Sequence, residues 1–310
     1  MDDTVFIMIG LLTLVLVLSF MRRRILPAES FMPNLPFMKT KLYWFVDAES
    51  NARNWWDFHG RRSMLPNRGY LQVALEALQR TQGDDFQIVP LIGRMDTMAA
   101  MGNPLPRAID LPPALWRSYV ISHLCANQGG LVIDGNSVLT LGPSFKPLVN
   151  SIRAAMFGTD HDEPVVNPTT DIAPGPDQYI GYASTAGHPA WIYAAKEYDA
   201  LVARGPQAWS SAVARRMPRA LWDQQLQLGM SIIRTAEGSR LEDGKLRQLE
   251  DYFGRVSNPT NPRQTLTKDA VYVAYDGDDL VRRYEFGWFS RLSPEQIKES
   301  DLVWTQYAGL

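Results

Sequence analysis

The chain has 310 residues, of which 45% are hydrophobic, and a formal net charge of −2. A chain of this length and apolar content can bury a large core, which excludes an intrinsically disordered protein. The basic residues are scattered along the sequence, which excludes the clustered positive charge of a nucleic-acid-binding protein. The single cysteine, Cys125, excludes an intramolecular disulfide and favours a reducing compartment.

A membrane anchor is predicted near the N-terminus. Residues 5–21 form an apolar run that reaches the lower length limit for a helix crossing a hydrocarbon core of about 30 Å. Two acidic residues precede the run and no small-residue cleavage site follows it, which favours an uncleaved anchor over a signal peptide. Residues 22–24 are all arginine, and arginine prefers the cytoplasmic side of a membrane. We therefore expect a single-pass membrane protein whose soluble domain lies on the cytoplasmic face.

The sequence predicts three parts. Residues 1–24 comprise the anchor and its basic flank. Residues 25–40 contain three prolines and little periodicity, which is typical of a tether. The folded domain is expected to span residues 41–310.

Strands and helices alternate at the start of this domain. Residues 41–46 and 86–92 form apolar runs typical of strands, and residues 70–81 between them have the helical period. This order predicts an α/β fold with an initial β-α-β unit. The first strand ends at Asp47 and leads into a polar loop, an arrangement that suits a nucleotide-binding β/α unit. Residues 94–113 contain several prolines and are expected to form a surface loop.

Two segments gather side chains that often carry chemistry. Residues 55–62, WWDFHGRR, suit either a stacking platform with arginines facing phosphate or an amphipathic helix turn with core aromatics. We favour the helix turn. Residues 159–164, TDHDEP, suit either extra metal ligands or a solvated loop, and we favour the loop.

The central stretch of the chain delivers a carboxylate to the end of a strand. A helix is expected to begin at Pro113, because proline is favourable at the first helical position, and the Gly129–Gly130 pair ends it. A short apolar strand then leads to Asp134. Ligands collect at the carboxyl ends of strands in open α/β sheets, so Asp134 is the principal candidate site residue. His123 lies on the apolar face of the helix and is interpreted as a core residue.

This stretch, residues 115–140, resembles the central motif of nucleotide-sugar glycosyltransferases with the A-type fold. It is closest to the capsular-polysaccharide-synthesis and sugar-binding D-x-D group, in which an Asp-x-x-Arg helix precedes a Gly-Gly, a short strand and an acidic motif. Residues 43–62, with the helix and strand that follow, are similar to that group's first β-α-β unit. Residues 179–209 are similar to its region after the motif, where a Gly-His-Pro begins a helix. The resemblance covers residues 41–209.

Four residues of the motif match in this chain: Arg117, Gly129, Gly130 and Asp134. Two acids of the pattern are replaced, because Ala114 stands in place of the helix acid and Asn136 in place of the second aspartate. The resemblance implies that Asp134 and Asn136 hold Mn²⁺ or Mg²⁺ against a sugar diphosphate. His188 of the Gly-His-Pro is a further candidate metal ligand, or simply a helix-start residue before Pro189.

The resemblance also implies roles for the remaining residues. Asp47 and the loop after it would contact the nucleotide, and Arg117 would position a sugar or phosphate. The glycine pair Gly129–Gly130 would allow close approach of the backbone.

The expected protein is a membrane-anchored, metal-dependent, retaining glycosyltransferase that moves a sugar from a nucleotide-sugar donor to a glycan or lipid-linked acceptor. The two replaced acids motivate an alternative, a catalytically degenerate relative that acts as a membrane-tethered binding or structural protein. A carboxylate or histidine brought to Asp134 from elsewhere, including the C-terminal third, would repair the motif. An α/β hydrolase finds no support, because the chain has no G-x-S-x-G sequence.

The C-terminal third carries weaker signals. Residues 221–253 are interpreted as two or three helical pieces and residues 270–275 as a strand. Residues 276–279, DGDD, are followed by the run LVRRYEF and are expected to form a hairpin turn. A calcium-binding EF-hand loop is rejected, because its downstream ligand spacing is absent. Residues 288–289, Trp-Phe, close the acceptor side of a cleft or pack in the core. Residues 293–296 predict the capped start of a last helix.

Overall fold

The computed structural model describes residues 39–47, 69–157, 179–233, 249–257 and 270–309, all within one compact unit, Lys39–Leu310. The predicted anchor, almost all of the tether, and residues 55–62 and 159–164 lie outside the described residues. Among the residues that are described, no helix is both long and apolar enough to cross a membrane.

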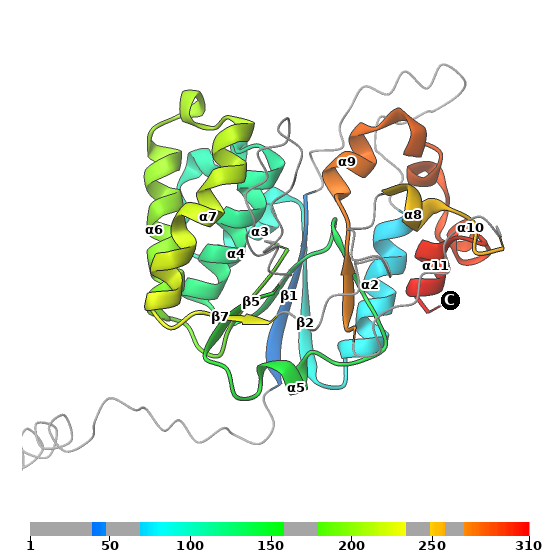
Figure 1. The fold of residues 1–310 in the computed structure, drawn as a ribbon, viewed down its shortest axis with the longest axis horizontal. Coiled ribbons are helices and arrows are strands. Elements are labelled where there is room, and N and C mark those ends of the chain that lie inside the picture. The colour runs from blue at the N-terminus through cyan, green and yellow to red at the C-terminus, as the bar shows by residue number, and fades with distance from the viewer. Residues whose placement is uncertain (1–38, 48–68, 158–178, 234–248, 258–269, 310) are drawn as a thin grey trace, which may run out of the picture. The chain divides into compact units, whose positions relative to one another are not determined.

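A six-stranded sheet forms the centre of the unit (Figure 1). Its strand order is β2 (Phe86–Ile92), β1 (Thr40–Val46), β3 (Gly130–Asp134), β6 (Ile180–Ala183), β5 (Ala154–Phe157) and β7 (Ser231–Ile233). The pairings of β1 with β2, β1 with β3 and β5 with β7 are parallel, whereas β6 runs antiparallel to both of its neighbours. The predicted α/β class is thus confirmed.

Both faces of the sheet are buried, and β1 illustrates why. Successive side chains of a strand point to opposite faces of the sheet. The inner residues of β1 are apolar without interruption, so both faces are apolar here. Tyr43 and Phe45 join the core on one side, whereas Leu42, Trp44 and Val46 join the core on the other.

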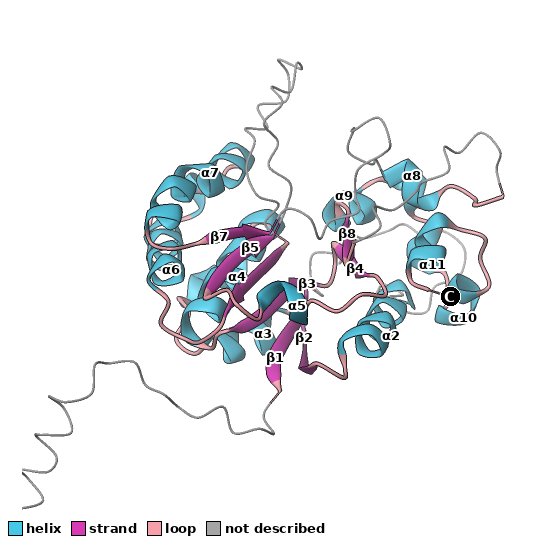
Figure 2. Ribbon diagram, turned by 60° about the horizontal axis from the view of Figure 1, so that its bottom comes forward, coloured by secondary structure: helices cyan, strands magenta, loops and turns pink. Residues whose placement is uncertain are grey.

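Helices cover one face of the sheet and a mixed layer covers the other (Figure 1). The first face carries α3 (Arg94–Met101), α4 (Pro113–Asn127), α6 (Pro189–Ala203) and α7 (Ser211–Gln227). The second carries α2 (Gly69–Gln82), α8 (Leu249–Phe253), α9 (Gly277–Arg282), α10 (Pro294–Lys298), α11 (Val303–Tyr307) and a two-stranded sheet of β4 (Val138–Thr140) and β8 (Tyr272–Ala274). Figure 2 shows this small sheet between the central sheet and the C-terminal helices. Short connecting helices are α5 (Lys146–Val149), η1 (Pro106–Asp110), η2 (Pro206–Ala208), η3 (Tyr284–Phe286) and η4 (Phe289–Arg291).

The turn from α4 into β3 sets the position of β3 in the sheet. Gly129 and Gly130 have φ values of 69° and 93°, which side chains rarely adopt. A Cβ on Gly130 would lie 2.5 Å from the carbonyl oxygen of Lys41, and one on Gly129 would lie 2.8 Å from the backbone of Thr185. The glycine pair therefore permits close approach of the protein's own backbone on both sides of β3.

Three predicted segments differ from the structure. Residues 94–113 were expected to form a loop, but they contain α3 and η1, because the prolines fall after α3 or at the first position of η1. Residues 276–279 start helix α9 and do not form a hairpin turn, since Asp276 caps the helix by accepting a hydrogen bond from the Asp279 backbone N–H at 2.8 Å. The interval 221–253 includes strand β7, which pairs with β5. The predicted capping box of α10 is confirmed.

Candidate functional site

The candidate site lies at the carboxyl edge of β1 and β3. These strands are parallel and pair Phe45 with Asp134, so their C-terminal ends lie side by side. Asp47 follows β1 directly, and Asp134 is the last residue of β3. Both aspartates are buried, which places two carboxylates where open α/β sheets gather their ligands.

Both carboxylate oxygens of Asp134 accept hydrogen bonds. Arg117, on the second turn of α4, donates from Nε to Oδ2 at 2.7 Å. The backbone N–H of Asn136 donates to Oδ1 at 3.0 Å. The bond from Asn136 fixes the orientation of the carboxylate, and the bond from Arg117 balances its charge.

The same guanidinium reaches a second carboxylate from the C-terminal third of the chain. Arg117 Nη2 donates to Asp278 Oδ2 at 2.9 Å, and the guanidinium carbon lies 4.5 Å from the ring centre of Tyr179. Burial disfavours the charge of Arg117, but Asp134, Tyr179 and Asp278 outweigh it and raise the pKa of the guanidinium. Arg117 therefore stays charged and bridges Asp134 to Asp278.

The carboxyl group of Asp278 has a raised pKa. Burial is the largest cause that raises the pKa of Asp278, and together with the nearby Asp134, Asp276 and Asp47 it brings this pKa to about 6 against the lowering effect of Arg117. Burial and the neighbouring carboxylates together therefore outweigh the effect of the single guanidinium on this carboxyl group.

Two Asp-Gly turns meet at this point, namely the turn that follows β3 and the N-terminal turn of helix α9. Residues 134–136 read Asp-Gly-Asn and residues 276–278 read Asp-Gly-Asp. Strands β4 and β8 pair Val138 with Ala274, and this pairing draws the two turns together. A Cβ on Gly277 would lie 2.1 Å from the carbonyl oxygen of Asn136, so only glycine permits this contact.

A buried hydroxyl lies where the turns meet. Ser137 is fully buried, and its Oγ has no hydrogen-bond partner among the described residues. This oxygen would lie 3.0 Å from a Cβ on Gly277, so it is directed at the second turn. A buried polar atom without a partner is uncommon in folded proteins and is often explained by a missing water or ion.

A second ion pair occupies the end of β1. Arg94 donates from Nε and Nη2 to Asp47 Oδ2 at 3.1 and 2.6 Å. Its Nη1 donates to the carbonyl oxygens of Ile109 and Leu111, and its guanidinium carbon lies 5.0 Å from the Trp116 ring centre. Asp47 was predicted to contact a nucleotide, but its carboxylate is paired with an arginine that is also held by the backbone.

The oxygen atoms of this site suit a divalent cation, but the ligand set needs a serine hydroxyl in addition to the carboxylates. Magnesium and manganese prefer hard oxygen ligands. Asp134, Asp278 and the Ser137 hydroxyl offer such oxygens, and the carboxylates outnumber the arginine. In the part of the chain that is described, no group of three His, Cys, Asp or Glu side chains is arranged to hold a metal ion.

Three residues predicted for the site lie at the opposite edge of the sheet. Gly129 precedes β3, and Gly130 is the first residue of β3 and pairs with Ala183 at the end of β6. His188 follows β6 and precedes α6, and the neighbouring Gly187 N–H donates to the carbonyl of Ala126. Burial and Arg153 lower the pKa of His188. The structure does not bring His188 to Asp134.

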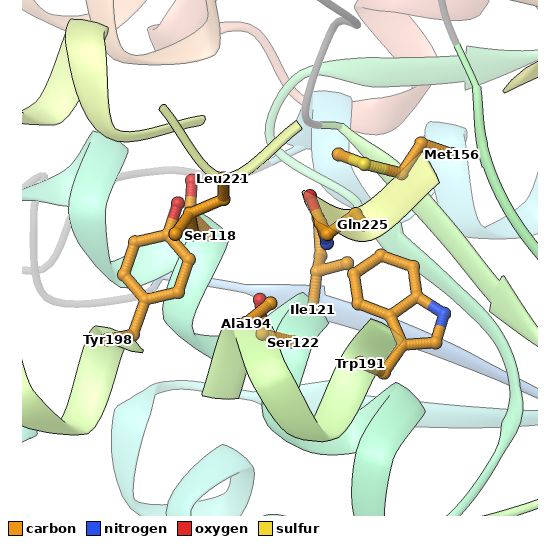
Figure 3. A pocket seen from close by; sticks show the side chains of 9 residues that line it. All are labelled: Ser118, Ile121, Ser122, Met156, Trp191, Ala194, Tyr198, Leu221 and Gln225. Carbon is orange, nitrogen blue, oxygen red and sulfur yellow. The ribbon is translucent and has the colours of Figure 1, made fainter. Parts of the chain in front are cut away.

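A separate hollow lies between α4, α6 and α7 (Figure 3). Its side chains, shown converging in the figure, are Ser118, Ile121, Ser122, Met156, Trp191, Ala194, Tyr198, Leu221 and Gln225. These residues include none of those that bridge Asp134 to Asp278. The hollow is therefore no part of the candidate site.

Two site residues, Asp278 and Ser137, were missed by the sequence analysis. The available signal was the repeated Asp-Gly dipeptide at residues 134–135 and 276–277. Its meaning depends on the pairing of β4 with β8, which no local pattern reveals.

The chain matches no family model, no curated protein and no solved structure. Its function is therefore proposed from the site geometry and from the sequence motif alone.

Proposed function

We propose that this protein is a membrane-anchored glycosyltransferase that moves a sugar from a nucleotide-sugar donor to a glycan or lipid-linked acceptor, with Mn²⁺ or Mg²⁺ as cofactor and retention at the sugar. The observation that carries the proposal is the bridge from Asp134 through Arg117 to Asp278. In this bridge Asp278, from the C-terminal third, provides a carboxylate beside Asp134. It would compensate for the acids that Ala114 and Asn136 replace in the motif. The mixed sheet flanked by helices is compatible with the A-type fold.

The proposed metal ligands are Asp134, Asp278 and Ser137. When bound, the cation would neutralise the diphosphate that leaves as the glycosidic bond breaks. Asn136 orients Asp134 through its backbone N–H, and its side-chain amide remains a candidate ligand. Arg117 would contact a phosphate or hydroxyl of the donor, since guanidinium groups bind phosphate in a bidentate manner.

The charge of the site supports metal dependence. Asp134, Asp276 and Asp278 surround Arg117, so the fully ionised cluster carries two excess negative charges. A sugar diphosphate is also an anion and would be repelled by this cluster. A divalent cation balances the excess and makes the edge acceptable to the donor.

A non-catalytic relative remains the second candidate, and one observation favours it. Both oxygens of Asp134 already have partners, as expected of a structural ion pair. In that case the bridge would only fasten α9 to the central sheet.

Donor binding and turnover by the full-length protein in detergent separate the two candidates. The assay offers a panel of nucleotide sugars with Mn²⁺ and follows release of nucleoside diphosphate. We expect metal-dependent release that Asp134→Asn abolishes, while Asp85→Asn, which alters a surface ion pair with Lys146, leaves it unchanged. An absence of both turnover and metal-dependent nucleotide binding would contradict the enzyme and favour the binding protein.

A further inference from the structure

We propose that Arg117 is a built-in counter-ion: it bridges Asp134 and Asp278 in the absence of ligand and exchanges with a divalent cation when the anionic donor binds. The identity of the anion rests on the proposed function. The exchange of Arg117 for a cation depends only on the contacts described above.

The contacts of Arg117 are of a kind that a cation can replace. Its ion pairs and hydrogen bonds within the described residues go to two carboxylates, Asp134 and Asp278, and its remaining contact is the ring face of Tyr179. No backbone carbonyl of the described residues accepts a hydrogen bond from it. A cation that takes over both carboxylates therefore leaves no protein acceptor of Arg117 unpaired.

The site also holds one oxygen that accepts no hydrogen bond from Arg117. Within the described part of the chain, the Ser137 Oγ is buried without a hydrogen-bond partner where the two Asp-Gly turns meet. The oxygen of a hydroxyl can coordinate a hard cation, as the Ser or Thr hydroxyl of a P-loop does with Mg²⁺. Together with Asp134 and Asp278, it gives a cation three protein oxygens, and the donor phosphates would supply the rest.

Exchange is favourable only if Arg117 gains a new anion. Displacing the guanidinium without replacing its carboxylates leaves a mostly buried charge unpaired, which is costly. A diphosphate provides the replacement, because its oxygens match the planar guanidinium. The cation and the anion should therefore each strengthen binding of the other, which makes Arg117 the coupling residue.

The exchange predicts an unusual result for Mn²⁺ alone. Arg117→Gln removes the competing positive charge while it keeps a polar side chain. We expect the variant to bind Mn²⁺ at least about tenfold more tightly than the wild type, because a nearby unit charge changes cation binding strongly in a buried site. Free Mn²⁺ is measured by electron paramagnetic resonance on the full-length protein in detergent, without nucleotide.

A matched control removes one positive charge elsewhere. Lys146→Gln breaks the surface pair with Asp85, which directly precedes β2 and so lies at the opposite end of the strands. It should leave Mn²⁺ affinity unchanged. Asp278→Asn should weaken Mn²⁺ binding, and adding Asp134→Asn to Arg117→Gln should cancel the gain.

Arg117→Lys is a second variant that keeps the test valid if Arg117→Gln does not fold. It keeps the charge, but an ammonium does not bridge two carboxylates as the guanidinium fork does, so a smaller gain in Mn²⁺ affinity is expected. Circular dichroism identifies the folded variants. If a folded Arg117 variant binds Mn²⁺ no more tightly than the wild type, or no variant binds Mn²⁺, the exchange is overturned.

The two proposals fail in different ways. If donor turnover is absent but Arg117→Gln gains Mn²⁺ affinity, the glycosyltransferase is wrong and the counter-ion stands. If turnover is present but Mn²⁺ affinity does not change, the counter-ion is wrong and the enzyme stands.

Discussion

Two arginines at the same edge of the sheet differ in what holds them. Arg94 pairs with Asp47, binds two backbone carbonyls of the η1 region and packs on Trp116. Arg117 is held by two carboxylates and the ring of Tyr179. The carbonyls tie Arg94 to the fold, because no ligand can replace them without leaving them unpaired. Whether an ion pair at a strand end serves the fold or ligand binding therefore depends on the remaining contacts of its arginine.

The largest expected effect is loss of the Arg94 pair. Arg94→Gln leaves the buried carboxylate of Asp47 without its cation, and breaking such a pair costs about 3–5 kcal/mol. Urea unfolding measures the loss. Arg117→Gln should cost less, since Asp134 keeps the hydrogen bond from the Asn136 backbone N–H and Asp278 is 29% exposed and can be solvated. Equal losses in the two variants would contradict the distinction between a structural and an exchangeable arginine.

A smaller effect is expected where the two turns meet. Gly277→Ala places a methyl group 2.1 Å from the carbonyl of Asn136, so the turns must separate. Overpacking of this kind costs about 1–3 kcal/mol, and the displaced Asp278 should also weaken Mn²⁺ binding. Gly142→Ala is the control, because no atom lies within 4 Å of its added methyl group. The two substitutions would behave alike if the turns did not touch.

The pH dependence of stability tests the burial of Asp278 among other carboxylates. The folded pKa of Asp278 is about 6, above its ordinary value of 3.8, so the folded state holds this proton more tightly than the unfolded state. The wild type therefore loses stability as pH rises from about 4 to about 6. Asp278→Asn removes this loss and should be more stable than the wild type above pH 6 by about 1–2 kcal/mol, with no difference below pH 4. Thermal melts between pH 4 and pH 8 measure the difference, and a destabilised variant at pH 7 would show that Asp278 serves the fold.

The smallest effect is expected at His188. Because this residue lies at the opposite edge of the sheet, His188→Ala should leave Mn²⁺ and donor binding unchanged. Isothermal titration with Mn²⁺ measures it. A clear loss of affinity would require a metal site that does not include Asp134.

Local patterns predicted much of the fold. The first two strands, α2 and α4 were predictable because apolar runs, helical periods and Pro113 act over a few neighbouring residues. Helix α3 was missed because prolines between 104 and 113 suggested a loop, although none of them lies within Arg94–Met101. Strand β7 was missed because three residues carry no period.

The site was only half predictable. Arg117 and Asp134 belong to a motif within one helix and the next strand. Asp278 reaches them only through the pairing of β4 with β8, and register between distant strands leaves no local signal. Gly129 and Gly130 show that closeness in the sequence motif does not mean closeness in space. The five-residue strand β3 is roughly 16 Å long and places the glycine pair at the opposite edge of the sheet from Asp134.

The most direct test of the account is Mn²⁺-dependent binding of a nucleoside diphosphate panel to the wild type, Asp134→Asn and Asp278→Asn. If the two Asp-Gly turns build one site, both variants should lose this binding by a similar factor, at least about tenfold. Binding by Asp278→Asn that equals the wild type, with Asp134→Asn impaired, would contradict the site proposed for this protein.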